Sequence, residues 1–158
     1  MPTLTPLLIT GLADLETLVG QEAGVTDWLV ISQEQVNQFA AATLDFQWIH
    51  TDPARAAAES PFGGTIAHGY LTVSLLPYFW SQLVTLENLK MQVNYEVESL
   101  RFNQAVGVGV PVRLRATVLS VADLRGIIKT RIGVKMEIEG QKKPAYTGVV
   151  TFLYHFEG

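Results

Sequence analysis

The 158-residue chain contains no cysteine, which excludes disulfide bonds, thiolate-bound zinc and a cysteine nucleophile. No Lys or Arg precedes Arg55, so the N-terminus lacks the basic segment with which a secretory signal begins. The longest apolar stretch is YLTVSLLPYFW, which is too short and too interrupted to cross a bilayer. We therefore expect one soluble, cytoplasmic domain of residues 1–158 with no membrane insertion.

The first half of the chain shows short helical patterns and little strand pattern. Residues 1–12 have little periodicity and are expected to form an extended N-terminal arm. A short helix is predicted at residues 14–19 and a short strand at residues 28–31. Ser32 and Gln35 have the spacing of a capping box, which predicts that another helix begins after Ser32.

The second half of the chain combines one apolar helix with long strands. Residues 66–83 are apolar on nearly every face, so a helix there must be wrapped by other structure, and Pro77 predicts a bend in it. Alternating apolar residues then predict strands at 91–102 (with a change of phase after Ser99), 110–118, 128–138 and 145–156. We expect an α+β fold in which an antiparallel sheet wraps around the central helix. Because strands of this length leave an unpaired edge, we also expect a homodimer.

The candidate chemistry lies in the stretch LDFQWIHTDPARAAAESPFGGTIAHG, residues 44–69. Asp45 precedes His50 by five residues, a spacing that places the two side chains on different faces of a helix and on opposite faces of a strand. We therefore expect the two residues to cooperate from an irregular loop. Asp52 and Pro53 are typical of a helix start, and a glycine-rich turn follows that helix.

One segment of the chain resembles the signature of the MaoC-like, (R)-specific enoyl-CoA hydratases: ATLDFQWIHTDPARAAAESPFGGTIAHGYLTVSLLP. The shared pattern is an Asp, four residues, a His, a short helix and a glycine-rich turn that ends in His-Gly. Gln47 and Trp48 stand where many members have Asn and Pro, and the Gln-Trp-Ile-His form is similar to the nodulation protein N sub-branch. Leu44 replaces the usual Gly, so a positive φ is costly at this turn.

The resemblance implies a hotdog fold and the reversible hydration of trans-2-enoyl-CoA to (R)-3-hydroxyacyl-CoA. Coenzyme A would be part of the substrate, and no separate cofactor would be needed. Asp45 and His50 would hold one water and exchange its protons, so that water adds to one face of the double bond. The backbone N–H of Gly69, with neighbours near Ala67 and His68, would stabilise the charge that develops on the thioester oxygen.

The resemblance also gives supporting roles to three side chains. Ser74 would line the site, His68 would position the glycine-rich turn, and Gln47 would orient the site in place of the family's Asn. In hotdog enzymes of this type the substrate tunnel lies between subunits, so the homodimer would be part of the function.

Each candidate residue also has a simpler explanation. Asp45 alone can cap a turn, Asp52 is a helix cap, and His155 on a predicted strand is given no role. A metal site at Asp45, His50 and Asp52 is rejected, because one His with two carboxylates and no Cys is a weak zinc pattern. Two other functions stay open: an acyl-carrier-protein 3-hydroxyacyl dehydratase and a non-catalytic acyl-CoA-binding hotdog protein.

Charge is distributed unevenly along the chain. Residues 1–54 carry a net charge of −7 and residues 55–158 carry +3. The bases are spread along the predicted strands rather than gathered in a patch, which argues against nucleic-acid binding. Some of these bases can meet the phosphates of coenzyme A, although a solvated strand face is the more usual explanation: Arg113, Arg115, Lys129, Arg131 and Lys135.

Overall fold

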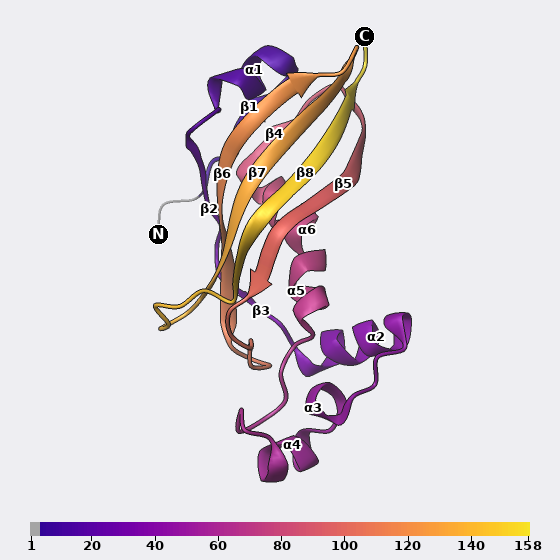
Figure 1. Ribbon diagram of the computed structural model, residues 1–158, viewed down its shortest axis with the longest axis vertical. Helices are drawn as coiled ribbons and strands as arrows, with labels where there is room; N and C mark the ends of the chain where they lie inside the picture. Colours follow the sequence, from indigo (N-terminus) through magenta and orange to yellow (C-terminus); the bar gives the residue numbers. More distant parts are fainter. Residues whose placement is uncertain (1–3) are drawn as a thin grey trace.

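The main sheet is formed by strands from both halves of the chain, in the order β2-β6-β7-β8-β5 with β3 also paired to β6 (Figure 1). The structure is a computed structural model that describes residues 4–158. Its strands in this sheet are β2 (Glu22–Val25), β3 (Leu29–Val30), β5 (Leu89–Phe102), β6 (Pro111–Asp123), β7 (Ile127–Ile138) and β8 (Tyr146–Phe156). All of these pairings are antiparallel, as the alternating pattern predicted.

The sheet curves around helices α5 (Gly69–Ser74) and α6 (Leu76–Leu83), which lie along its inner face (Figure 1). Phe79 and Trp80 are almost fully buried in the core, and the indole N–H of Trp80 donates to the hydroxyl of Tyr154 at 2.6 Å. The predicted α+β hotdog fold is thus confirmed. The predicted helix at 66–83 begins later, at Gly69, and is divided at Leu75, so the bend expected near Pro77 is present.

Strand β5 lies at an edge of the sheet and contains three irregularities of register. One falls between Glu98 and Arg101, where Ser99 has a φ of 50°, and it confirms the predicted change of phase. A second, between Asn94 and Glu96, and a third, between Leu89 and Met91, were not predicted. Directly paired residues point to the same face of a sheet, so this second bulge changes which side chains of β5 face inward. The apolar residues before and after it do not share one face.

The N-terminal segment adds a small second sheet. Strand β1 (Leu7–Ile9) pairs in parallel with β4 (Val84–Leu86), so part of the arm expected at residues 1–12 is a strand. Residues 1–3 of that arm lie outside the described residues. Helix α1 (Leu12–Thr17) falls two residues before its predicted range of 14–19.

Three helices precede the glycine-rich turn: α2 (Gln33–Thr43), α3 (Trp48–Thr51) and α4 (Pro53–Glu59). Ser32 caps α2 with the predicted reciprocal bonds to Gln35, and Asp52 caps α4 by accepting from the N–H of Arg55. These helices lie together at one end of the sheet, next to the start of α5 (Figure 1). Within residues 4–158 no helix is both long enough and apolar enough to span a bilayer.

Candidate active site

His50 lies on the four-residue helix α3 and is 6% exposed. Its position in a helical turn corrects the prediction that it would lie in an irregular loop; the turn begins at Gln47, whose carbonyl accepts from the N–H of His50 at 3.0 Å. The ring Nδ1 lies 2.7 Å from the carbonyl oxygen of Ile66. Because a carbonyl can only accept, Nδ1 carries the proton, which leaves Nε2 as an acceptor in the neutral ring.

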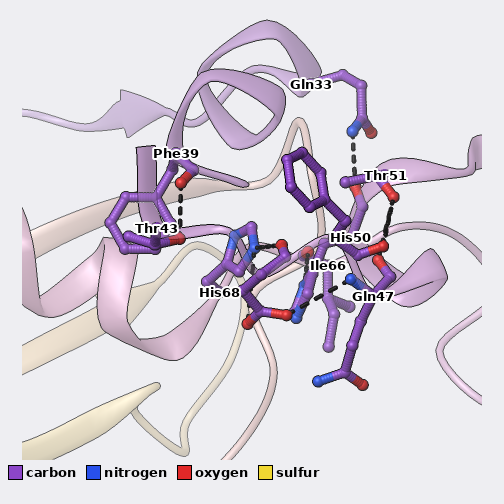
Figure 2. Close-up of polar contacts among 10 residues, drawn as sticks. Gln33, Phe39, Thr43, Gln47, His50, Thr51, Ile66 and His68 are labelled. Atoms are coloured by element: carbon purple, nitrogen blue, oxygen red, sulfur yellow. Dashed lines mark hydrogen bonds and ion pairs between the residues drawn. The ribbon is translucent and has the colours of Figure 1, made fainter. Parts of the chain in front are cut away.

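The environment of His50 favours this neutral form. Burial lowers the pKa of His50, and the hydrogen bond to Ile66 offsets only part of that effect. His68 stacks on His50 with ring centroids 3.9 Å apart and 22° between planes (Figure 2). If both rings were protonated, their positive charges would repel each other, so His68 also lowers the pKa of His50.

His68 is buried at the start of α5 and holds the Asp45 loop. Its Nε2 lies 3.0 Å from the backbone carbonyl oxygen of Asp45, so Nε2 carries the proton. The Phe39 ring packs against the imidazole, with the two ring centroids 4.9 Å apart. Its Nδ1 is buried without a hydrogen-bond partner among the described residues. His68 therefore connects the start of α5 with the Asp45 loop.

Asp45 lies in the four-residue link between α2 and α3, residues 44–47. Its side chain is 43% exposed, one carboxylate oxygen is 3.4 Å from the N–H of Gln47, and the other is 3.9 Å from Nε2 of His68. The preceding residue, Leu44, has φ 64° and ψ 21°. A positive φ was expected to be costly at Leu44, and the residue nevertheless adopts one, because the end of α2 requires a left-handed residue there.

A side chain that sequence reasoning missed joins these segments. The Gln33 amide donates to the backbone carbonyl of His50 at 2.7 Å (Figure 2). It also accepts from the hydroxyl of Thr65 at 2.6 Å. Gln33 thus connects the start of α2 with α3 and the glycine-rich turn. Its partners are 17 and 32 residues away in sequence, so no local pattern could have identified it.

A cavity of about 510 Å³ opens beside these groups. Asp45, His50 and His68 lie on one side of it, and the end of β5 with the following loop forms another. Phe102 packs directly over Gly69: a Cβ at Gly69 would lie 2.8 Å from the Phe102 ring. The cavity is lined by further apolar and polar side chains, including Phe62, Tyr70, Thr72, Asn103, Gln104 and Val106.

Two other predicted site residues lie elsewhere. Gln47 is exposed, and Figure 2 shows its amide directed away from the two imidazoles. Ser74 is exposed, donates to the carbonyl of Tyr70 at 2.7 Å and lines a separate groove of about 360 Å³ between α5, α6, β5 and β8. Ala67 donates its N–H to Val106 at 2.8 Å, so that amide is not free to bind a ligand as suggested.

The donor atoms of Asp45, His50 and His68 all lie within 4.8 Å of one another. His68 therefore takes the place that the sequence analysis gave to Asp52, which is occupied as a helix cap. Two of the four ring nitrogens already donate to carbonyls and cannot ligate a cation in that state. The spacing suits a water molecule hydrogen-bonded between the carboxylate and an imidazole.

Most of the bases on the strands are held in ion pairs. Glu137 accepts from both Arg113 and Arg115, Arg131 pairs with Glu98, and Lys129 lies 4.0 Å from Glu96. Among residues 4–158, Lys135 has no such partner. These four bases are therefore explained by ion pairs on the solvent-facing side of the sheet rather than by binding to phosphates.

In this hotdog fold a buried, neutral imidazole lies beside a carboxylate at the edge of a cavity, an arrangement that can exchange a proton with a bound molecule. The MaoC like domain family matches residues 14–139. The chain therefore belongs to the MaoC-like hydratase and dehydratase family, and it is an enzyme of the hydro-lyase type.

The similar proteins include 3-hydroxyacyl-thioester dehydratase Z of Mycobacterium tuberculosis, which is 46% identical over 134 residues, 84% of this chain and 88% of that protein. Nodulation protein N of Rhizobium meliloti is 47% identical over 139 residues, 86% of each chain. Among solved structures, the (R)-hydratase from A. caviae involved in PHA biosynthesis is 26% identical with a TM-score of 0.68, covering 85% of this chain and 94% of that one. The resemblance seen in the sequence is thereby confirmed.

Proposed function

We propose that the protein catalyses the reversible hydration of trans-2-enoyl-CoA to (R)-3-hydroxyacyl-CoA. The observation that carries this proposal is the hydrogen bond from Nδ1 of His50 to Ile66, which leaves Nε2 free to accept a proton beside the Asp45 carboxylate. The similarity to a 3-hydroxyacyl-thioester dehydratase and an (R)-hydratase supports the same reaction class.

In the hydration direction, Asp45 and His50 hold one water over Cβ of the enoyl group. As the water oxygen bonds to Cβ, its proton moves to Nε2 of His50, and the electrons of the double bond move to the thioester oxygen. The imidazolium then returns the proton to Cα as the enolate collapses. Asp45 orients the water and stabilises the transient imidazolium. Because one water supplies both new substituents from one side, the addition is syn.

The enolate oxygen would bind the N–H of Gly69. Gly69 is the first residue of α5, where the backbone N–H groups have no acceptor within the helix. Phe102 covers the Cα of Gly69 and leaves no space for a side chain, so the thioester oxygen would approach along the amide. Loss of such a donor typically costs about 2.7–4 kcal/mol of transition-state stabilisation.

The acyl chain would extend from the cavity along α5 toward the groove that Ser74 lines. That groove follows the same helix and the same strand, and its walls include the apolar side chains of Val73, Leu76 and Val97. Ser74 would therefore contact the acyl chain rather than the reacting atoms.

The active form would be a homodimer associated through β5. Among residues 4–158 no strand pairs with the outer edge of β5, and Tyr95 and Val97 are 57% and 58% exposed there. A second copy would cover this apolar surface and enclose the groove. The proposed compartment is the cytoplasm. Disulfides are rare in that reducing environment, and a chain without cysteine fits it.

The test follows the loss of enoyl-thioester absorbance with short and medium 2-enoyl-CoA. Asp45→Asn and His50→Gln should each reduce the rate by about 10²–10⁴, the range for a positioned acid–base group. Both variants should remain folded, since Gln can still donate to Ile66. An inactive wild type, or active variants, would contradict the proposal.

No metal is part of the proposed site. Enzyme dialysed against EDTA should keep its full rate, because water rather than a cation bridges Asp45 and His50. Loss of activity that Zn²⁺ or Mg²⁺ restores would show that Asp45, His50 and His68 hold a metal after all.

A further inference from the structure

We propose that a basic recess on the outer face of the sheet binds the phosphorylated adenosine end of coenzyme A. The recess has a volume of about 310 Å³ and lies between Trp28, strands β6 and β7, and the β7–β8 hairpin. It is separate from the catalytic cavity. This inference rests on the proposed function, because it identifies the carrier of the thioester that the catalytic cavity would receive.

The first argument is charge. Lys135, Lys142 and Arg113 line the recess together with one acid, Glu137. Glu137 is already neutralised by two guanidinium groups, since Arg113 and Arg115 contact its oxygens at 2.7 and 2.8 Å. Among the ion pairs within residues 4–158 none involves Lys135 or Lys142. Two ammonium groups therefore remain available to phosphate oxygens, which Lys binds as a point charge.

The second argument is the flat surface beside these ammonium groups. The guanidinium carbon of Arg113 lies 4.3 Å from the centroid of the Trp28 ring, and Trp28 is 39% exposed. A tryptophan stacked with an arginine on a protein surface offers a plane against which a purine can pack. An aromatic plane next to unpaired bases matches a nucleotide better than an inorganic anion or a carboxylate.

The third argument is position relative to the catalytic cavity. Consecutive residues of the β7–β8 hairpin line the two sites: Ala145 lines the catalytic cavity and Pro144 lines the recess. The hairpin is tied to the cavity wall by Gln104, whose amide donates to the carbonyl of Lys143 at 2.7 Å. An extended pantetheine arm that leaves the cavity and crosses this hairpin would bring the adenosine phosphates to Lys142 and Lys135.

The experiment compares two substrates with the same 2-enoyl chain: the CoA thioester and the N-acetylcysteamine thioester, which lacks the nucleotide. Lys142→Glu, on the exposed hairpin, and the double variant Lys135→Glu/Lys142→Glu should raise KM for the CoA thioester about tenfold or more, the effect of one lost charge-assisted hydrogen bond. kcat for the CoA thioester and KM for the N-acetylcysteamine thioester should not change. Arg125→Glu, in the β6–β7 turn at the other end of the sheet, is the matched charge control.

Equal effects on both thioesters, or no effect on either, would overturn the recess while leaving the hydratase intact. If no thioester is turned over, the proposed function fails, and the recess is tested by titrating adenosine 3′,5′-bisphosphate into the wild type and the double variant. Binding that the wild type shows and the double variant loses would support the recess. Equal binding by both, or binding by neither, would overturn it.

Discussion

The acid–base behaviour of the site is decided by single residues around His50. The carbonyl of Ile66 fixes the proton on Nδ1, and burial opposes a second proton on the ring. Asp45 and His50 could both be named as candidates from the sequence because their spacing and the His-Gly turn form a recognisable motif. The choice of His50 as the proposed proton acceptor could not be made from the sequence, because it depends on the hydrogen bond from Nδ1 to the backbone carbonyl of Ile66, and any residue at position 66 has such a carbonyl.

The lowered pKa of His50 predicts how hydration responds to pH. In the proposed mechanism the neutral ring accepts the proton of the water, so kcat/KM should rise with pH and level off, with a midpoint below the ordinary histidine value of about 6.5. The pH profile of kcat/KM for a 2-enoyl-CoA measures this midpoint. His68→Asn, which removes the stacked ring, gives a comparison in which one cause of the shift is absent and the midpoint should move upward. A wild-type midpoint above 6.5 would contradict the assignment.

Leu44 provides a prediction about stability. Its left-handed φ of 64° costs about 1–2 kcal/mol for a residue with a Cβ, and its side chain is 77% exposed, so little packing would be lost on truncation. Leu44→Gly should stabilise the protein by about 0.5–1 kcal/mol after the extra flexibility of Gly is subtracted. Thermal unfolding measures the gain. Leu44→Ala keeps the Cβ and is the control; an equal gain in that variant would show that strain is not the cause.

At the scale of elements, the patterns that repeat within one strand or helix were predictable and the joints between elements were not. The capping box at Ser32, the division of the central helix near Pro77 and the alternating strands all follow from local sequence. The bulge between Asn94 and Glu96 does not, because it is visible only in the pairing with β8. The helical turn that carries His50 is likewise too short to show a period.

The Gln33 side chain joins α2 to α3 and to the glycine-rich turn, so its removal should affect both stability and activity. Gln33→Leu should leave the carbonyl of His50 and the hydroxyl of Thr65 without their partner. Such a loss costs about 1–3 kcal/mol of stability, and α3 should shift relative to the glycine-rich turn, which would lower kcat.

Urea unfolding and steady-state kinetics measure the two effects of Gln33→Leu. Gln38→Leu, on the exposed side of the same helix, is the matched control and should change neither. Gln33→Glu retains an acceptor for Thr65 but loses the donor to His50, so it should lose kcat while keeping part of the stability. A full rate in Gln33→Leu would show that the glycine-rich turn and α3 hold His50 without this link.

At the scale of the whole molecule, the described chain leaves one long edge unpaired. Strand β5 pairs only with β8, and its exposed apolar side chains lie beside the groove proposed for the acyl chain. The sequence predicted a dimer from strand length, but the three irregularities of register in β5 determine which side chains a partner would meet. The edge and the groove share Tyr95 and Val97, so in the proposed dimer association and substrate binding would involve the same surface.

Val97→Asp tests whether that surface is the dimer contact. A carboxylate at a position that is 58% exposed in the single chain should leave the folded subunit intact, yet burying it unpaired in an interface costs several kcal/mol. The variant should therefore elute as a monomer in size-exclusion chromatography with light scattering, and it should lose hydratase activity because the groove is no longer enclosed. Leu124→Asp, in the β6–β7 turn and 48% exposed, introduces the same charge and should remain dimeric and active. If Val97→Asp stays a fully active dimer, the subunits associate through another surface and the groove is complete within one chain.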